Sequence, residues 1–110
     1  MKVFVTAAFA AAWLAFAAHP AAAADRAQLK RGHDLLAANC ARCHAVGLRG
    51  ASPHRKAPPF RRLGRHYPID SLEESLAEGI LTGHPDMPEF SFDAHDVGAI
   101  IAYLKAIQRR

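Results

Sequence analysis

The feature that most constrains this chain is the run Cys40-Ala41-Arg42-Cys43-His44, which holds both cysteines of the 110 residues and places a histidine after the second. Three chemistries use two thiols at this spacing: a disulfide or redox dithiol, half of a zinc site, and covalent attachment of a c-type haem. Each supplies a cross-link or a bound group around which a small domain can pack.

The histidine that follows Cys43 favours haem. Two thiols three residues apart at the end of a helix can each add to one vinyl group, and the adjacent imidazole then reaches the iron from the same side. No second cysteine pair is present to complete a zinc ribbon, and no strand and helix alternation indicates a thioredoxin-like domain. We expect one haem c, held by Cys40 and Cys43, with His44 as an iron ligand; a disulfide, a dithiol and a metal site without haem are the alternatives.

The first 24 residues are typical of a secretory signal peptide. Lys2 precedes an apolar run over residues 3–18, and Pro20 and a series of alanines lead to Asp25. A retained anchor is the alternative, but the run is shorter than the roughly 18 to 20 residues of a spanning helix. We therefore predict a signal peptide over residues 1–24, export to the periplasm, and no stable membrane insertion.

Residues 25–110 are expected to form one domain. They contain only 22 large apolar side chains, so a bound group is expected to complete the core. Their net charge of +3 is too small to indicate nucleic-acid binding. The composition also excludes a large enzyme with its own deep substrate cavity.

The apolar spacing predicts an all-α domain with three main helices and long loops. The first helix is expected over Ala27–Asn39, and the second over about Leu72–Thr82, where Ser71 and Glu74 fit a capping box. Asp93 can cap a third helix, whose apolar positions recur at helical spacing: Val97, Ile100, Ile101, Leu104 and Ile107. The Gly- and Pro-rich segments over residues 46–67 and 83–92 are predicted loops, with a short turn near residues 60–63.

A second iron ligand is expected in the later loop. Met87 is the only methionine of residues 25–110, and Pro85 and Pro88 flank it. A lone methionine commonly fills gaps in a core, but this setting favours ligation, with His84 as the rival ligand. The other histidines of the domain are expected to be solvated: His33, His54, His66 and His95.

These residues resemble class I c-type cytochromes, specifically the small exported monohaem cytochromes of bacteria, over residues 28–108. The resemblance implies a cytochrome c fold in which the N- and C-terminal helices cross at Gly32 and Tyr103. It also implies that the carbonyl oxygen of Pro58 accepts the Nδ1 proton of His44, and that Met87 lies in the distal ligand loop. The tryptophan that binds a haem propionate in many members is missing, because Trp13 lies in the predicted signal.

The expected function is one-electron transfer through a haem with His44 and Met87 as axial ligands. Because both axial positions are filled, we expect a carrier and not an enzyme. Apolar side chains are expected to surround the haem and exclude water from it: Phe60, Leu63, Leu81, Phe90 and Ile100. The alternatives are a dedicated haem subunit of a periplasmic dehydrogenase or oxidase complex, and a haem sensor or weak peroxidase with a labile Met87.

Seven basic residues fall within 24 positions without an acidic residue among them: Arg42, Arg49, Arg55, Lys56, Arg61, Arg62 and Arg65. Part of this set is expected to steer a redox partner protein, such as a dehydrogenase, reductase or terminal oxidase, into a transient complex with a monomer. The alternative is a solvated loop whose charges only keep the protein soluble.

Overall fold

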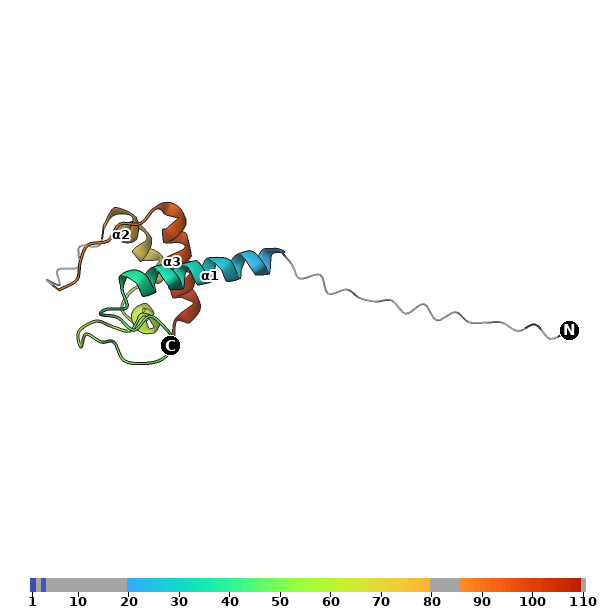
Figure 1. Cartoon of the computed structure of the whole chain (residues 1–110), viewed down its shortest axis with the longest axis horizontal. Helices are drawn as coiled ribbons and strands as arrows, with labels where there is room; N and C mark the ends of the chain where they lie inside the picture. Colours follow the sequence, from blue (N-terminus) through green and yellow to red (C-terminus); the bar gives the residue numbers. More distant parts are fainter. Residues whose placement is uncertain (2, 4–19, 80–85, 110) are drawn as a thin grey trace.

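The computed structural model describes residues 1, 3, 20–79 and 86–109. Its elements are α1 (Pro20–Asn39), the 3-10 helices η1 (Phe60–Arg65) and η2 (Ile69–Ser71), α2 (Leu72–Glu78) and α3 (Ala94–Ile107) (Figure 1). No strand occurs within residues 20–79 and 86–109. The predicted all-α class, with three main helices and long loops, is confirmed.

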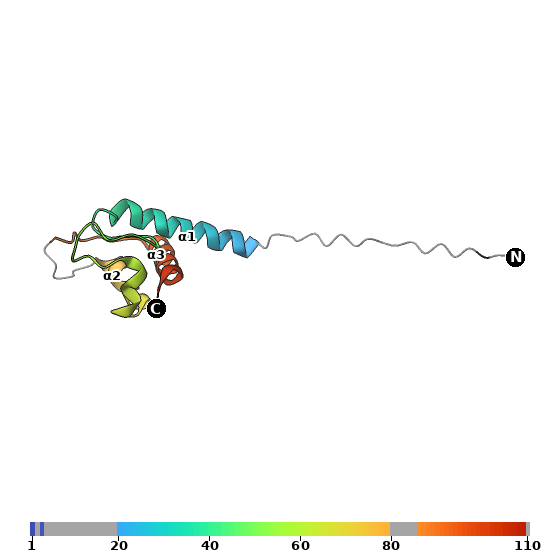
Figure 2. The same cartoon turned by 90° about the horizontal axis from the view of Figure 1, so that it is seen from below.

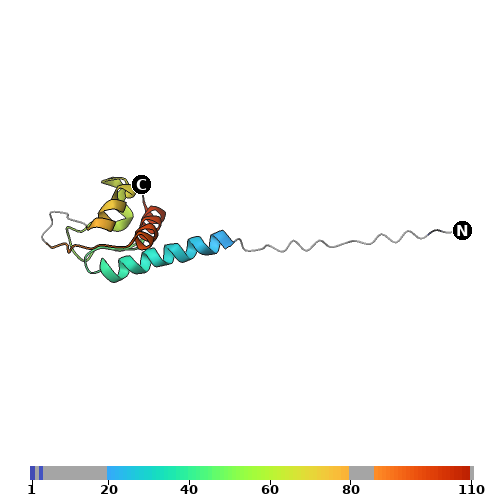
Figure 3. The same ribbon diagram turned by 90° about the horizontal axis from the view of Figure 1, so that it is seen from above.

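Helix α3 lies between α1 on one side and α2 on the other, as Figure 2 and Figure 3 show from opposite directions. The periodicity that predicted α3 corresponds to its buried face, since all five apolar positions named for it are at most 8% exposed. Asp93 caps the helix as predicted, because its carboxylate accepts a hydrogen bond from the N–H of Asp96 at 2.8 Å. The predicted start of this helix after Asp93 and its predicted apolar face are therefore confirmed.

Helices α1 and α3 cross at Gly32. A Cβ placed on Gly32 overlaps the carbonyl oxygen of Ala99 and comes within 2.8 Å of the Cβ of Tyr103. The backbones can approach this closely only because glycine has no side chain. Beside the crossing, the guanidinium of Arg31 donates to the carboxylate of Asp96 at 2.6 Å.

Helix α1 begins at Pro20, seven residues before its predicted start at Ala27. Proline is favoured in the first turn of a helix, because the N–H groups of that turn have no acceptor within the helix and proline lacks an N–H. The alanines that follow have the highest helix propensity of all residues. The predicted end at Asn39 is correct.

The capping box predicted at the start of α2 is wrong. Ser71 already has helical backbone angles, and its hydroxyl donates to the carbonyl of Pro68 at 2.7 Å instead of capping α2. The reason is that η2 leads directly into α2, so no extended residue stands at the junction. Helix α2 ends at Glu78, because Gly79 takes a positive φ of 108°. The predicted continuation to about Thr82 is therefore wrong from Gly79 on, and residues 80–82 themselves lie outside the described residues.

Candidate functional site

The turn that follows α1 holds both cysteines and His44. The N–H of Cys40 donates to the carbonyl of Leu36 at 2.8 Å, so this residue continues the last turn of the helix. The carbonyl of Cys40 then accepts from the N–H groups of Cys43 at 3.1 Å and His44 at 2.9 Å. All three residues of the motif are half-buried within this single turn.

The environment of Cys40 suits an uncharged sulfur. Burial, with a smaller contribution from the neighbouring Cys43, raises the pKa of its thiol to about 11. Redox dithiols and zinc sites depend on a stable thiolate, and burial disfavours the thiolate here. A thioether bond to haem carries no charge and is compatible with this burial.

The imidazole of His44 is oriented by residues 58–60. Its Nδ1 lies 2.8 Å from the carbonyl oxygen of Pro58. A carbonyl can only accept a hydrogen bond, so Nδ1 carries a proton, and in the neutral ring the lone pair is then on Nε2. The ring of Phe60 stacks on the imidazole with centroids 4.5 Å apart and planes inclined by 26°. An oriented imidazole with a free Nε2 lone pair is the donor that haem iron requires.

The long loop after His44 is held by hydrogen bonds between distant segments. Phe60 donates its N–H to the carbonyl of Ala45 at 3.0 Å, and the hydroxyl of Ser52 accepts from the N–H of Ala45 at 3.0 Å. The hydroxyl of Tyr103 donates to the carbonyl of Val46 at 2.7 Å. Burial raises the pKa of Tyr103, which favours the protonated form that makes this bond. The loop is therefore anchored to α3 as well as to η1.

Met87 lies in the described part of the distal loop and is half-buried, whereas the rival His84 lies outside the described residues. The segment is tied to the cysteine turn through His54, whose N–H donates to the carbonyl of Cys43 at 3.1 Å. The Nε2 of His54 lies 3.3 Å from the carboxylate of Asp86, which directly precedes Met87. Since Ser91 bonds the carbonyl of Ala77 at 2.9 Å, the segment after Met87 is also fixed to α2.

The expectation of a solvated His54 holds only in part. Its side chain is 35% exposed, and Nδ1 accepts from the N–H of Lys56 at 3.1 Å. His33 is also half-buried, with its ring 5.5 Å from that of Tyr103. His66 and His95 are exposed, as expected. His33 and His54 each combine a local contact, to Asp34 and to Lys56, with a contact to a segment distant in the sequence. The sequence gives no signal for the distant contacts.

The apolar side chains expected around the haem are buried or half-buried where the structure describes them. Phe60 and Leu63 are 7% and 6% exposed, Ile100 is fully buried, and Phe90 is half-buried. Leu81 lies outside the described residues. Three of these side chains thus belong to one contiguous core with α3.

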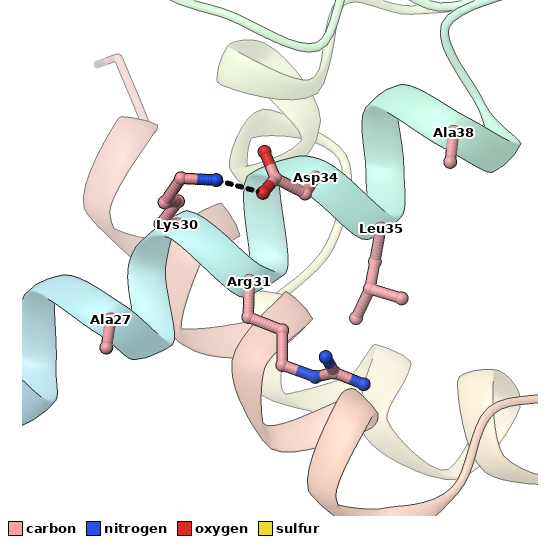
Figure 4. Close-up of a pocket in the computed structure, with 6 residues that line it drawn as sticks. All are labelled: Ala27, Lys30, Arg31, Asp34, Leu35 and Ala38. Carbon is pink, nitrogen blue, oxygen red and sulfur yellow. Dashed lines mark hydrogen bonds and ion pairs between the residues drawn. The ribbon is translucent and has the colours of Figure 1, made fainter.

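A groove of about 370 Å³ runs along α1 and is a separate feature (Figure 4). It is lined by Ala27, Lys30, Arg31, Asp34, Leu35 and Ala38. Its wall carries the exposed ion pair between Lys30 and Asp34. Since neither the cysteines nor His44 contribute to its lining, the groove is not part of this site.

The helical fold, the two cysteines and the oriented histidine define a small monohaem c-type cytochrome, with covalent haem c as its cofactor. Residues 27–104 match the family model described as cytochrome c oxidase, cbb3-type, subunit III. The chain belongs to this family of cytochrome c domains. The resemblance noted in the sequence is thereby confirmed, as is haem-based electron transfer as the general function.

Two curated relatives are similar over most of the chain. A cytochrome bc1 complex cytochrome c subunit of Corynebacterium diphtheriae is 33% identical over 87 residues, which cover 74% of this chain but 28% of that protein. A cytochrome c6 of Picosynechococcus is 35% identical over 91 residues, which cover 77% of this chain and 75% of that protein. No solved structure matches. Among the described residues, no helix has the length and apolar character needed to span a membrane.

Proposed function

We propose that this protein is a periplasmic one-electron carrier in which His44 and Met87 are the axial ligands of a haem tethered by Cys40 and Cys43. The observation that carries the proposal is the 2.8 Å hydrogen bond from His44 Nδ1 to the carbonyl of Pro58. That bond fixes the tautomer and leaves Nε2 as the only ring nitrogen able to bind iron. Residues 1–24 direct export in this proposal, and residues 25–110 are the working domain.

The bound haem supplies a couple between Fe(III) and Fe(II) that takes up and releases one electron. The residues of the chain set the conditions for that couple. Met87 provides a neutral thioether, which favours the ferrous state and raises the potential relative to a second histidine. The buried Phe60, Leu63 and Ile100 exclude water, which disfavours the additional charge of the ferric state. With two protein ligands bound, no open position remains for a substrate, so the protein acts as a carrier and not as an enzyme.

The charged side chains of residues 42–65 support the proposal that the redox partner is an acidic protein. Six of its seven basic side chains are exposed, and among the described residues none of these six forms an ion pair: Arg42, Arg49, Arg55, Lys56, Arg62 and Arg65. We call these six residues the basic surface. Arg61 is excluded from it because its side chain is half-buried, with Nη1 covered by the protein. The basic surface shares one continuous segment with the cysteine turn and η1, and thus steers a partner toward the haem.

Optical spectra of the exported protein in both redox states test the proposed ligands. A pyridine haemochrome of c type is expected from attachment through both cysteines. A near-infrared charge-transfer band is expected from the bond between Met87 and ferric iron. The band is lost in Met87→Ala and kept in the matched variant His84→Ala. Loss of the band in His84→Ala with retention in Met87→Ala would assign the position to His84 and overturn the proposal.

A dedicated haem subunit is the second candidate, favoured by the printed names of the bc1 complex subunit and of the family. Purification under native conditions separates the two. A carrier elutes as a free monomer of residues 25–110, whereas a subunit elutes with its complex. Carbon monoxide binding tests the third alternative, a haem sensor or weak peroxidase with a labile Met87. A ferrous carrier that keeps Met87 bound does not bind carbon monoxide at neutral pH, whereas a sensor or peroxidase does.

A further inference from the structure

Gln108, the residue directly after α3, connects the end of the chain to η1. Its Nε2 donates to the carbonyl of Leu104 at 2.7 Å and to the carbonyl of Phe60 at 2.9 Å. Its Oε1 accepts from the N–H of Gly64 at 2.7 Å. Both donor hydrogens and one acceptor lone pair of the amide are therefore used. The bond to Leu104 alone would cap α3, so the other two bonds need a separate explanation.

The same stretch of chain reinforces the connection. The N–H of Arg109 donates to the carbonyl of Arg61 at 2.7 Å. Residues 108 and 109 thus hold η1 at three of its six positions, across more than 40 residues of sequence. We call this set of hydrogen bonds the carboxy-terminal clasp.

The clasp acts on the segment that orients His44. Gln108 holds the carbonyl of Phe60, while the N–H of Phe60 is held by Ala45 at 3.0 Å. With both backbone groups fixed, the Phe60 ring is kept on the His44 imidazole at 4.5 Å. The carbonyl of Pro58, two residues earlier, is kept 2.8 Å from Nδ1.

We infer that Gln108 is a positioning residue for His44, acting through Phe60 and the Pro58 carbonyl, and that it thereby sets the reduction potential of the haem. This inference rests on the proposed role of His44 as an iron ligand. A strong hydrogen bond from Nδ1 to a carbonyl makes the imidazole a better donor and stabilises Fe(III). Loosening the clasp weakens that bond, so the ferrous state becomes more favourable relative to the ferric state and the reduction potential rises.

The first test replaces Gln108 by methionine, which has a similar length and makes none of the three hydrogen bonds. In the holoprotein, Gln108→Met is expected to shift the equilibrium toward ferrous iron by about threefold, or about 28 mV at 59 mV per tenfold for one electron. Exchange of the His44 Nδ1 proton, followed by NMR in the ferrous state, is expected to become faster.

The matched control is Ile107→Val, which loosens the same end of α3 without touching the clasp. Ile107 is 6% exposed, so its truncation lowers thermal stability in the manner of a purely structural defect. The control is expected to leave the potential and the Nδ1 exchange near their native values. Equal shifts in the two variants, or an unchanged potential in Gln108→Met, would show that Gln108 only stabilises the fold.

A second variant tests the clasp with Gln108 in place. A Cβ added at Gly64 lies 3.0 Å from Oε1 of Gln108, so Gly64→Ala displaces the amide by a few tenths of an ångström and lengthens its hydrogen bonds. The potential is expected to rise in Gly64→Ala and to show no further rise when Gly64→Ala is added to Gln108→Met. Additive shifts would overturn the route through Gln108. Failure of the proposed function is distinguishable, because the native protein would then lack the charge-transfer band before any substitution is made.

Discussion

Gly32 of α1 faces the backbone carbonyl of Ala99 in α3 so closely that no Cβ fits between them, and the two helices meet backbone to backbone. Gly32→Ala forces its new Cβ into that carbonyl and to 2.8 Å from the Cβ of Tyr103. Since neither neighbour is the free end of a side chain, the helices must separate. We expect a loss of about 3 kcal/mol in the free energy of unfolding, measured on the holoprotein by denaturant titration with circular dichroism.

The matched control for this prediction is Gly47→Ala, because a Cβ at Gly47 meets no atom within 4 Å. The control is expected to change the free energy of unfolding by less than about 0.5 kcal/mol. Similar losses in the two variants would contradict the close crossing of the helices.

The ion pair between Arg31 and Asp96 makes the stability of the crossing depend on pH. The hydrogen bond from Arg31 lowers the pKa of the Asp96 carboxyl below its ordinary value. The ionised carboxylate therefore stabilises the fold in full above about pH 5, and this stabilisation is lost as the pH falls through the lowered pKa. Asp96→Asn is expected to be less stable than the native protein at pH 7 and to converge with it near pH 2.

Arg31→Met supplies the control for the ion pair. It removes the cation, so Asp96→Asn is expected to have a smaller effect in the Arg31→Met background than alone. Thermal unfolding at several pH values measures both effects. A gap between Asp96→Asn and the native protein that persists unchanged at pH 2 would refute the pairing as its cause.

The haem is expected to be required for folding. Residues 25–110 supply only 22 large apolar side chains, and part of the core packs beside the cysteine turn. Cys40→Ala combined with Cys43→Ala should leave the domain largely unfolded by far-ultraviolet circular dichroism. A stable, helical apoprotein would contradict this expectation.

Neutralising two residues of the basic surface is expected to slow association with an acidic redox partner. Arg62→Gln with Arg65→Gln should lower the association rate severalfold at low salt and have little effect at 1 M salt, where the screening length is about 3 Å. Stopped-flow electron transfer measures the rate. The control is Arg26→Gln with Lys30→Gln on α1, which removes the same charge away from the basic surface; equal slowing by both pairs would exclude steering by residues 62 and 65.

Local pattern predicted the elements whose determinants lie close together in the sequence. Helix α3 has a regular apolar spacing and an aspartate at its start, and both features correspond to buried side chains and to a cap in the structure. The run from Cys40 to His44 likewise contains both attachment cysteines and the proposed iron ligand within five residues. The start of α2 at Leu72 was also predicted correctly, but its capping box was not, because Ser71 matches a cap by residue type while η2 occupies the position before the helix.

Contacts between distant segments had no signal in the sequence. His54 reaches Asp86, 32 residues later, and Gln108 reaches Phe60, 48 residues earlier. Each is a common polar residue in an unremarkable local setting, so only the fold shows that it is ordered. The position of Pro58 relative to His44 was implied by the family resemblance, and the hydrogen bond between them is present in the structure.

The placement of α3 between α1 and α2 has a consequence for the order in which the chain matures. A polypeptide emerges from the ribosome, or from a translocation channel, with its amino-terminal end first. Among the described elements, α3 is the main packing partner of α1, and it is available only once residues 94–107 follow. During that interval the turn with Cys40 and Cys43 protrudes from an undocked helix, open to any machinery that joins haem to the thiols. When α3 then packs against α1, it completes the domain after the haem has been attached to the cysteines.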